Sequence, residues 1–228
     1  MIIYIIMAVV AYLIGSISFS VIISKKVAGI DVRNEGSKNA GTTNVLRTVG
    51  KRAAALTLIG DISKGLVAVL IGYIIGLFAK NNNPAILVEI AGLFVVLGHM
   101  FPIFFDLKGG KGVATSLGIL LLMNWKIGLI CIIFGVILIA ITRMVSLGSI
   151  SGAILFFILT IFINDGYIVE YNATFILFGA ILCAIVVFNH RANLKRIING
   201  NENKLSFKKK EESTEDTDDN NDENDVEE

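Results

Sequence analysis

Two polar segments interrupt an otherwise apolar sequence, and both combine glycine with basic side chains. The first runs from Asp31 to Asn44 and is followed by Arg47. Gly36 and Gly41 allow the backbone to turn and to approach an anion closely, while hydroxyl, amide and guanidinium groups supply hydrogen-bond donors. This composition is typical of a phosphate cradle. A basic loop on the inner side of a membrane would have the same composition, so the pattern alone leaves both interpretations open.

The second polar segment places Lys108 and Lys111 close to the start of an apolar stretch. Three glycines accompany them, Gly109, Gly110 and Gly112. Flexible backbone donors, positive charge and the amino-terminal end of a helix together favour binding of an anion such as phosphate. The segment is not a nucleotide-binding P-loop, because Phe105 stands where that motif requires its first glycine. A tight turn between helices, with lysines reaching the membrane surface, is the alternative.

A third set of polar residues lies within or beside apolar stretches. Asp61 and Lys64 are three residues apart and can share one face of a helix as an ion pair. The pair either neutralises itself inside a helix bundle or contacts a substrate directly. His99 and His190 are the only histidines of the chain. Each could serve as a general base or as a hydrogen-bonded structural group.

The sequence lacks the residue spacings that are typical of metal sites and of disulfide frameworks. Its two cysteines, Cys131 and Cys183, lie inside apolar stretches, where a thiol usually behaves as a small hydrophobic group. Neither histidine belongs to a cluster with metal-ligand spacing. We therefore expect no metal ion.

The elements that carry these residues are predicted to cross a membrane. Of the 228 residues 54% are hydrophobic, the mean hydropathy is +0.74 and only two are proline, unlike a water-soluble domain. A helix needs about 20 apolar residues to cross the hydrocarbon core. The stretches that approach this length are Ile2–Ile23, Ala53–Phe78, Ala85–Phe105, Met144–Ile163 and Ala173–Phe188. The first is expected to be a retained membrane helix, because no basic region precedes it and no small-residue cleavage site follows.

The apolar stretch Val113–Thr142 is too long for one ordinary span and is interrupted only at Asn124-Trp-Lys126. Two short helices joined there fit better, and the first is long enough to span only if it begins near Gly109. Positive residues near helix ends favour the cytoplasm. With seven spans and an external amino terminus, eighteen of the twenty Lys and Arg residues fall inside or at inner helix ends. The exceptions are Lys80 and Lys126.

The fold is therefore predicted to be an all-α integral membrane bundle of seven transmembrane helices, with short helices and glycine-rich cytoplasmic loops. Its amino terminus is expected outside and its carboxyl terminus inside. The net charge of +1 hides two regions, since residues 211–228 hold eleven acids and residues 1–210 carry +12. We expect a membrane domain over residues 1–205 and a basic-then-acidic disordered cytoplasmic tail over residues 206–228.

Five segments, taken in order, resemble the bacterial acyl-phosphate:glycerol-3-phosphate acyltransferase family. They are Gly15-Ser-Ile-Ser-Phe19, Gly36-Ser-Lys-Asn-Ala-Gly-Thr-Thr-Asn-Val-Leu-Arg47, Gly60-Asp-Ile-Ser-Lys-Gly65, Gly98-His99 with Lys108-Gly-Gly-Lys-Gly-Val-Ala-Thr115, and His190-Arg-Ala-Asn193. The resemblance covers residues 1–205 and leaves the acidic tail outside. The chain departs from the family at Lys38, Ala40 and Thr42, where Gly, Pro and Ala are usual, and at Ser18, where Pro is usual.

The resemblance implies the residues of an active site. The catalytic residues would be Ser37, Arg47, Lys111, His190 and Asn193. The substrate-binding residues would be Asn39, Thr43, Asn44, Asp61, Lys64, His99, Lys108, Gly109, Gly110, Gly112 and Ser146. Glu202 would hold the last segment of the site in place.

The resemblance also implies the reaction. Acyl phosphate would acylate the 1-hydroxyl of glycerol 3-phosphate, giving lysophosphatidic acid and phosphate in the first step of phospholipid synthesis. The site would face the cytoplasm at the bacterial cell membrane, with these two substrates and membrane lipid as partners. No cofactor and no nucleic acid would take part. Two cationic cradles agree with this chemistry, because they can hold two phosphate groups side by side in an oriented reaction. Other glycerolipid acyltransferases have a His and an Asp separated by four residues. Neither histidine here is followed by Asp at that spacing, which argues against coenzyme A thioesters as donors.

Two other classes of protein remain as alternatives. A transporter for a phosphorylated solute would place polar residues at the bilayer midplane and show weak internal repeats. Here the polar segments gather toward one face, and the sequence has no repeat at a fixed period. A membrane scaffold that recruits partners through the acidic tail would leave both glycine-rich segments without a role.

Overall fold

The computed structural model describes residues 1–79, 84–163 and 173–205. Within these ranges the chain forms helices and loops and no strand. The helices are α1 (Ile2–Gly15), α2 (Phe19–Ala28), α3 (Thr42–Thr48), α4 (Lys51–Phe78), α5 (Pro84–Met100), η1 (Ile103–Phe105), α6 (Val113–Met123), α7 (Trp125–Thr142), α8 (Val145–Phe162), α9 (Ala173–Asn189) and α10 (Arg191–Ile198). Lys80 and the predicted tail from residue 206 lie outside the described residues.

The first apolar stretch is broken into two helices. Because α1 ends at Gly15 and α2 begins at Phe19, the single helix expected over residues 2–23 is wrong at this point. A break leaves nearby backbone carbonyl groups without regular helical partners. The ammonium group of Lys64 in α4 donates to the carbonyl oxygens of Gly15 and Ile17, at 3.0 and 2.9 Å. A charged side chain from another helix thus stabilises the interruption.

Residues 113–142 form two helices, as the sequence predicts. Asn124 separates α6 from α7, and its side-chain oxygen accepts a hydrogen bond from the backbone N–H of Ile127 at 3.1 Å. The first of these helices does not begin near Gly109, the start that it would need to span, because the backbone N–H groups of residues 109 and 110 donate to α5. With 11 residues, α6 is only about 16 Å long and too short to cross the bilayer alone.

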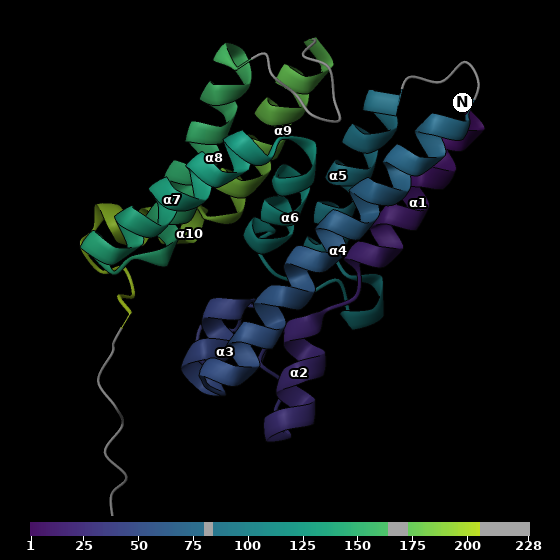
Figure 1. The fold of residues 1–228 in the computed structure, drawn as a ribbon. Helices are drawn as coiled ribbons and strands as arrows, with labels where there is room; N and C mark the ends of the chain where they lie inside the picture. Colours follow the sequence, from purple (N-terminus) through teal and green to yellow (C-terminus); the bar gives the residue numbers. More distant parts are fainter. Residues whose placement is uncertain (80–83, 164–172, 206–228) are drawn as a thin grey trace, which may run out of the picture.

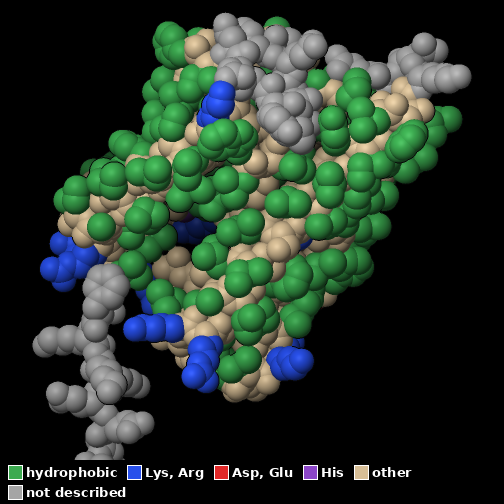
Figure 2. Space-filling model, in the orientation of Figure 1, with side chains coloured by type: hydrophobic (Ala, Val, Ile, Leu, Met, Phe, Trp, Pro, Cys, Tyr) green, Lys and Arg blue, Asp and Glu red, His purple; other side chains and the backbone are tan. Residues whose placement is uncertain are grey.

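Five described helical segments are long and apolar enough to cross a membrane. They are α1 with α2, α4, α5 with η1, α7 and α8. α9 and α10 together would make a sixth, with a 62° bend between them. Apolar side chains cover the sides of the bundle, whereas most of the visible Lys and Arg residues lie at its lower end (Figure 2). This surface is typical of an integral membrane protein.

The helices form two groups that meet around α6 (Figure 1). In one group α5 packs against α1 and α4, and in the other α8 packs against α7 and α9. Glycines permit the closest crossings: a Cβ at Gly98 of α5 would lie 2.1 Å from the carbonyl oxygen of Tyr12 in α1. α2, α3 and the α7–α8 turn all lie toward the lower end of the bundle (Figure 1). The polar segments of the sequence are therefore brought to one end.

Candidate functional site

A cavity of 710 Å³ lies between the two groups of helices. Its polar end is formed by the first loop (residues 29–41), the second loop (residues 106–112) and the α9–α10 junction. Its other end is lined by apolar side chains of α6, α7, α8 and α9. Figure 2 shows a hollow in the apolar surface with a Lys or Arg side chain visible inside it. One space therefore joins a cationic polar end to an apolar chamber.

The buried side chain of Asn44 at the start of α3 holds the first loop in shape. Its amide nitrogen donates to the carbonyl oxygens of Val32, Glu35 and Asn39, at 2.8, 3.0 and 3.1 Å. Its oxygen accepts from the N–H of Ser37 at 2.9 Å. Gly36 has a φ of +54°, and a Cβ there would lie 2.5 Å from the Asn44 oxygen. Asn44 therefore acts through the conformation of the loop.

The glycines of the second loop allow close approach to α5 and to the first loop. The N–H groups of Gly109 and Gly110 donate to the last carbonyl groups of α5, both at 3.1 Å. A Cβ on Gly109 would lie 2.0 Å from the carbonyl oxygen of His99, and one on Gly110 would lie 2.6 Å from that of Ala40. Because larger residues do not fit, this packing explains the glycine pair that precedes Lys111.

Lys111 presents a positive charge to the polar end of the cavity. Its ammonium group donates to the side-chain oxygen of Asn193, whose amide nitrogen donates to Glu202 at 2.8 Å. Burial, opposed by the charge of Glu202 and reinforced by the charges of Arg196 and Arg47, lowers the pKa of Lys111 to about 8. Lys111 is therefore mostly protonated at neutral pH, and its position is set by Asn193.

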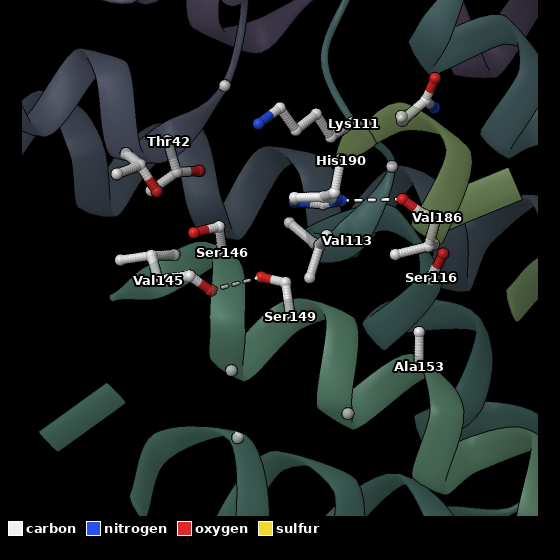
Figure 3. Close-up of a pocket in the computed structure, with 18 of the residues that line it drawn as sticks. Thr42, Lys111, Val113, Ser116, Val145, Ser146, Ser149, Ala153, Val186 and His190 are labelled. Carbon is white, nitrogen blue, oxygen red and sulfur yellow. Dashed lines mark hydrogen bonds between the residues drawn. The ribbon is translucent and has the colours of Figure 1, made fainter. Parts of the chain in front are cut away.

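His190 is held as a neutral ring beside Lys111 (Figure 3). Its Nδ1 lies 2.8 Å from the carbonyl oxygen of Val186, which can only accept, so Nδ1 must carry the hydrogen. Burial, followed by the charge of Lys111, lowers the pKa of His190 to about 4. The lone pair is therefore on Nε2 at neutral pH. In this state the ring can accept a hydrogen bond from a hydroxyl group in the cavity.

Glu202 connects three elements around the polar end. Besides Asn193, it accepts hydrogen bonds from Ser146 of α8 at 2.9 Å and from Arg196 of α10 at 3.0 Å. Burial alone would raise the pKa of Glu202, but these hydrogen bonds lower it below its usual value. The carboxylate is thus charged at neutral pH. These contacts support the expected role of Glu202 in holding the last segment, which stays a prediction.

The segment after α10 returns across the cavity. The carbonyl oxygen of Asn203 accepts from the guanidinium group of Arg47 at 3.3 Å. The N–H of Leu205 donates to the carbonyl oxygen of Arg143 in the α7–α8 turn at 2.8 Å. The segment after α10 is therefore joined both to α3 and to the α7–α8 turn at the polar end.

Asp61, Lys64 and His99 form a buried cluster where α4 meets α5. One carboxylate oxygen of Asp61 lies 3.0 Å from the Lys64 ammonium and 3.4 Å from Nδ1 of His99. Asp61 and His99 line the cavity, but Lys64 does not. Since Lys64 binds carbonyl groups at the α1–α2 break, its geometry supports the structural alternative for this residue.

Most of the expected site residues line the cavity. They are Ser37, Asn39, Thr43, Asn44, Arg47, Asp61, His99, Lys111, Gly112, Ser146, His190, Asn193 and Glu202. Lys64, Lys108, Gly109 and Gly110 do not line it. The side chain of Lys108 is exposed, and the two glycines act through close backbone packing. Direct substrate contact is therefore not supported for these four residues.

The cavity is also lined by polar residues that the sequence motifs did not identify. They are Lys38, Thr42, Ser116, Ser149, Asn189, Arg196 and Asn203. Ser149 lies three residues after Ser146, and Arg196 three residues after Asn193, so each shares a helix face with an expected site residue. That spacing could have identified both.

Metal binding has no visible basis in the described ranges. Residues 1–79, 84–163 and 173–205 contain no group of three or more His, Cys, Asp or Glu side chains that could hold a metal ion. The cationic side chains at the polar end suit an anion instead. Independence from metals and cofactors stays a prediction.

The sequence matches a protein-family model described as glycerol-3-phosphate acyltransferase over residues 5–200. Curated relatives carry the same description. A protein of Clostridioides difficile (strain 630) is 45% identical over 206 residues, which is 90% of this chain and 97% of the relative. A protein of Nostoc sp. (strain PCC 7120) is 42% identical over 212 residues, covering 87% and 90% of the two chains.

Two crystal structures of PlsY, an integral membrane glycerol 3-phosphate acyltransferase, have a similar fold. The glycerol 3-phosphate form gives a TM-score of 0.77 at 34% identity and covers 89% of this chain and 96% of that chain. The lysophosphatidic acid form gives a TM-score of 0.76 at 33% identity, with 89% and 95% covered. The likeness therefore extends over most of the membrane domain.

Proposed function

Because the chain belongs to the glycerol-3-phosphate acyltransferase family, we propose that it transfers an acyl group from acyl phosphate to the 1-hydroxyl of glycerol 3-phosphate. The products are lysophosphatidic acid and inorganic phosphate. The observation that carries this proposal is the single cavity with a cationic end and an apolar end. Such a space suits an acyl phosphate, which joins an anionic head to an apolar chain.

The polar end has donors for two phosphate groups. Arg47 and the backbone of the first loop stand on one side, and Lys111 stands on another. Charge-assisted hydrogen bonds from these groups can orient both phosphates before reaction. We assign no substrate to either loop, because both present positive charge and backbone donors.

The reaction exchanges one bond at the acyl carbon. The hydroxyl oxygen of glycerol 3-phosphate forms an ester bond to the carbonyl carbon, and the bond from that carbon to the phosphate oxygen breaks. The hydroxyl proton passes to the departing phosphate, which leaves as inorganic phosphate. Acyl phosphate is already an activated mixed anhydride, so positioning and stabilisation of negative charge by Lys111 and Arg47 carry the catalysis.

We expect Arg47→Ala to lower kcat/KM by at least about a hundredfold, because a charged donor to phosphate is lost.

A neutral His190 fits this scheme as a group that orients the hydroxyl. His190→Gln should lower kcat by less than about tenfold, because in this scheme His190 is not the general base. Loss of a general base would lower kcat by about 10²- to 10⁴-fold. Initial rates of lysophosphatidic acid formation test both variants. A hundredfold loss of kcat in His190→Gln would contradict proton transfer to phosphate.

The cavity end of the bundle is proposed to face the cytoplasm of a bacterial cell. The placement of positive residues supports seven membrane segments with the amino terminus outside, formed by α1–α2, α4, α5, α6, α7, α8 and α9. Because α6 is too short for a bilayer of ordinary thickness, the bilayer would have to thin around it. Labelling of single cysteines in intact cells tests the orientation. A cysteine at Lys126 should react with an impermeant maleimide from outside, whereas one at Lys195 should not. The reverse pattern would contradict the proposed topology.

A further inference from the structure

Arg33 connects the two loops that form the polar end of the cavity. It lies in the first loop, and its side chain is 15% exposed. Its Nη1 donates to the carbonyl oxygen of Phe105 at 2.6 Å and to the carboxylate of Asp106 in the second loop at 3.3 Å. Nε and Nη2 donate to the carboxylate of Asp31, at 3.0 and 2.8 Å. The guanidinium group of Arg33 therefore joins the first loop to Phe105, which lies 72 positions later in the sequence.

Asp31 fixes the direction of the Arg33 side chain. Its carboxylate also accepts from the backbone N–H of Arg33 at 3.0 Å and lies 3.4 Å from the ammonium of Lys25. Hydrogen bonds from Arg33 hold the pKa of Asp31 well below its usual range, so the pair stays charged at neutral pH. A bidentate pair of this kind depends on the planar fork of arginine, which lysine cannot reproduce.

The contact falls where the second loop is strained. Asp106 and Leu107 have left-handed backbone angles, with φ of 55° and 57°, which are unfavourable for a residue that is not glycine. The carbonyl oxygen of Phe105 also accepts from the N–H of Lys108 at 3.1 Å. Strained backbone persists only where surrounding contacts hold it. Arg33 supplies such a contact three residues before the glycine pair.

We propose that Arg33 is a positioning residue that sets the separation of the two phosphate-binding loops, an inference that rests on the proposed function. Arg33 is not among the residues that line the cavity, so it acts without touching a substrate. Its neighbour Val32 is held by Asn44, and the turn at Phe105 leads to Lys111. Without the guanidinium group, each loop keeps its own hydrogen bonds but can move relative to the other.

The effect is expected on turnover rather than on binding. Each phosphate keeps its own donors in an Arg33 variant, so KM for each substrate should stay within about threefold. The acyl transfer requires both substrates in register, and a misplacement of about 1 Å can lower the rate by about a hundredfold. We therefore expect kcat to fall by about 10- to 100-fold.

The kinetic test uses the full chain purified in detergent, with glycerol 3-phosphate and palmitoyl phosphate. Arg33→Ala and Arg33→Lys should both lose kcat, because lysine keeps the charge but not the fork. The matched control is Asp106→Asn. Asp106 is 78% exposed, so its variant should keep kcat within about twofold. The thermal midpoint of each variant establishes that it is folded.

A second measurement tests the same idea without activity. Spin labels are placed on cysteines at Glu35 in the first loop and at Phe104 in η1, next to the second loop. With Cys131 and Cys183 replaced by alanine, they report the distance across the contact that Arg33 makes. The distance distribution should broaden in Arg33→Lys and stay narrow in Asp106→Asn.

Two results would overturn the proposal. One is an unchanged distance distribution together with kcat within twofold of wild type in Arg33→Lys. The other is an unchanged kcat with a raised KM for both substrates, which would make Arg33 a binding residue. A wild-type protein that forms no product would contradict the proposed function only, since the spin labels still test the position of the loops.

Discussion

Burial lowers the pKa of both Lys111 and His190 at the polar end, but it leaves the first charged and the second neutral at neutral pH. Lys111 keeps most of its charge at neutral pH even though its pKa is lowered to about 8. His190, with a pKa lowered to about 4, is neutral under the same conditions. Their proximity supports this division, because the Lys111 cation disfavours a second cation on His190. The pair therefore offers one charge for a phosphate and one uncharged acceptor for a hydroxyl.

The pH dependence of kcat/KM should report Lys111. The side chain is protonated below its pKa and loses its charge above it, so kcat/KM should fall as the pH rises through about 8. Lys111→Arg should remove this decline, whatever its absolute rate, because arginine stays protonated. His190 should give no acid limb between about pH 5 and 7. Initial rates across pH test both statements, and an unchanged decline in Lys111→Arg would assign it to another group.

Lys38 carries backbone strain at a position where the resembled family usually has glycine. Its φ is 56°. Glycine would remove about 1–2 kcal/mol of strain but lose about 0.5–1 kcal/mol through the greater freedom of the unfolded chain, so Lys38→Gly should raise the free energy of unfolding by about 0.5–1 kcal/mol. Lys38→Ala is the matched control, because it removes the charge but keeps the Cβ. Denaturant unfolding in detergent measures both. An equal gain in Lys38→Ala would attribute the effect to charge rather than to strain.

Sequence reasoning located many of the residues at the polar end because glycine, basic and amide residues are close together along the chain. It placed Lys111, Arg47 and Asn193 in one site through a family resemblance. It could not find the contact of Arg33 with Phe105, because the two residues are joined only by the tertiary fold. Lys64 was also ambiguous, since its spacing from Asp61 does not reveal a break in another helix.

At the scale of helices, α7 and α8 form much of the apolar chamber. Residues along α8 line it at intervals of three or four, from Ser146 near the polar end through Ser149 and Ala153 to Phe156. Phe156 is buried and packs edge-on against Phe175 and Phe178 of α9, at centroid distances of 6.4 Å. Because α8 rises about 1.5 Å per residue, the lining extends about 15 Å from Ser146 to Phe156.

Filling this chamber should discriminate between acyl donors by length. Ala153→Leu adds apolar volume to the wall, so kcat/KM should fall about tenfold with palmitoyl phosphate and less than about threefold with octanoyl phosphate. Ile154→Leu is the control, because Ile154 is 43% exposed on the same helix and does not line the cavity. Equal losses with both donors would show that Ala153 does not contact the acyl chain.

The helices were largely predictable because apolar stretches of sufficient length are separated by polar residues. The hairpin at Asn124 followed from length and charge, and the structure confirms the two helices. The break between Gly15 and Phe19 was missed because Ser16, Ile17 and Ser18 do not interrupt the apolar character strongly. The sequence left the start of α6 open, since hydropathy cannot show that the second loop bonds back to α5.

For the whole molecule, the arrangement of polar groups favours an enzyme over a transporter. The polar segments meet at one end of the bundle, whereas transport across the bilayer needs a path with access from both sides. Proteoliposomes containing the protein should therefore take up no labelled glycerol 3-phosphate beyond protein-free vesicles. Uptake that depends on the protein would support the transporter instead.

The acidic tail should be dispensable for acyl transfer. Among the residues that the structure describes, those that line the cavity end at Asn203. We expect deletion of Glu211–Glu228 to leave kcat/KM within about twofold. Deletion from Gly200 onward is the informative contrast, because it also removes Glu202 and its hydrogen bonds to Ser146 and Asn193. Initial rates of both truncated proteins make the comparison. A large loss on removal of the acidic segment alone would show that the tail takes part in catalysis or assembly.

The identity of the acyl donor is tested most directly by the initial rate of lysophosphatidic acid formation from radiolabelled glycerol 3-phosphate. The purified protein is supplied in detergent with either palmitoyl phosphate or palmitoyl coenzyme A. We predict product from palmitoyl phosphate and none above background from the thioester. Product from palmitoyl coenzyme A alone would contradict the proposed donor, and product from neither would contradict the proposed activity.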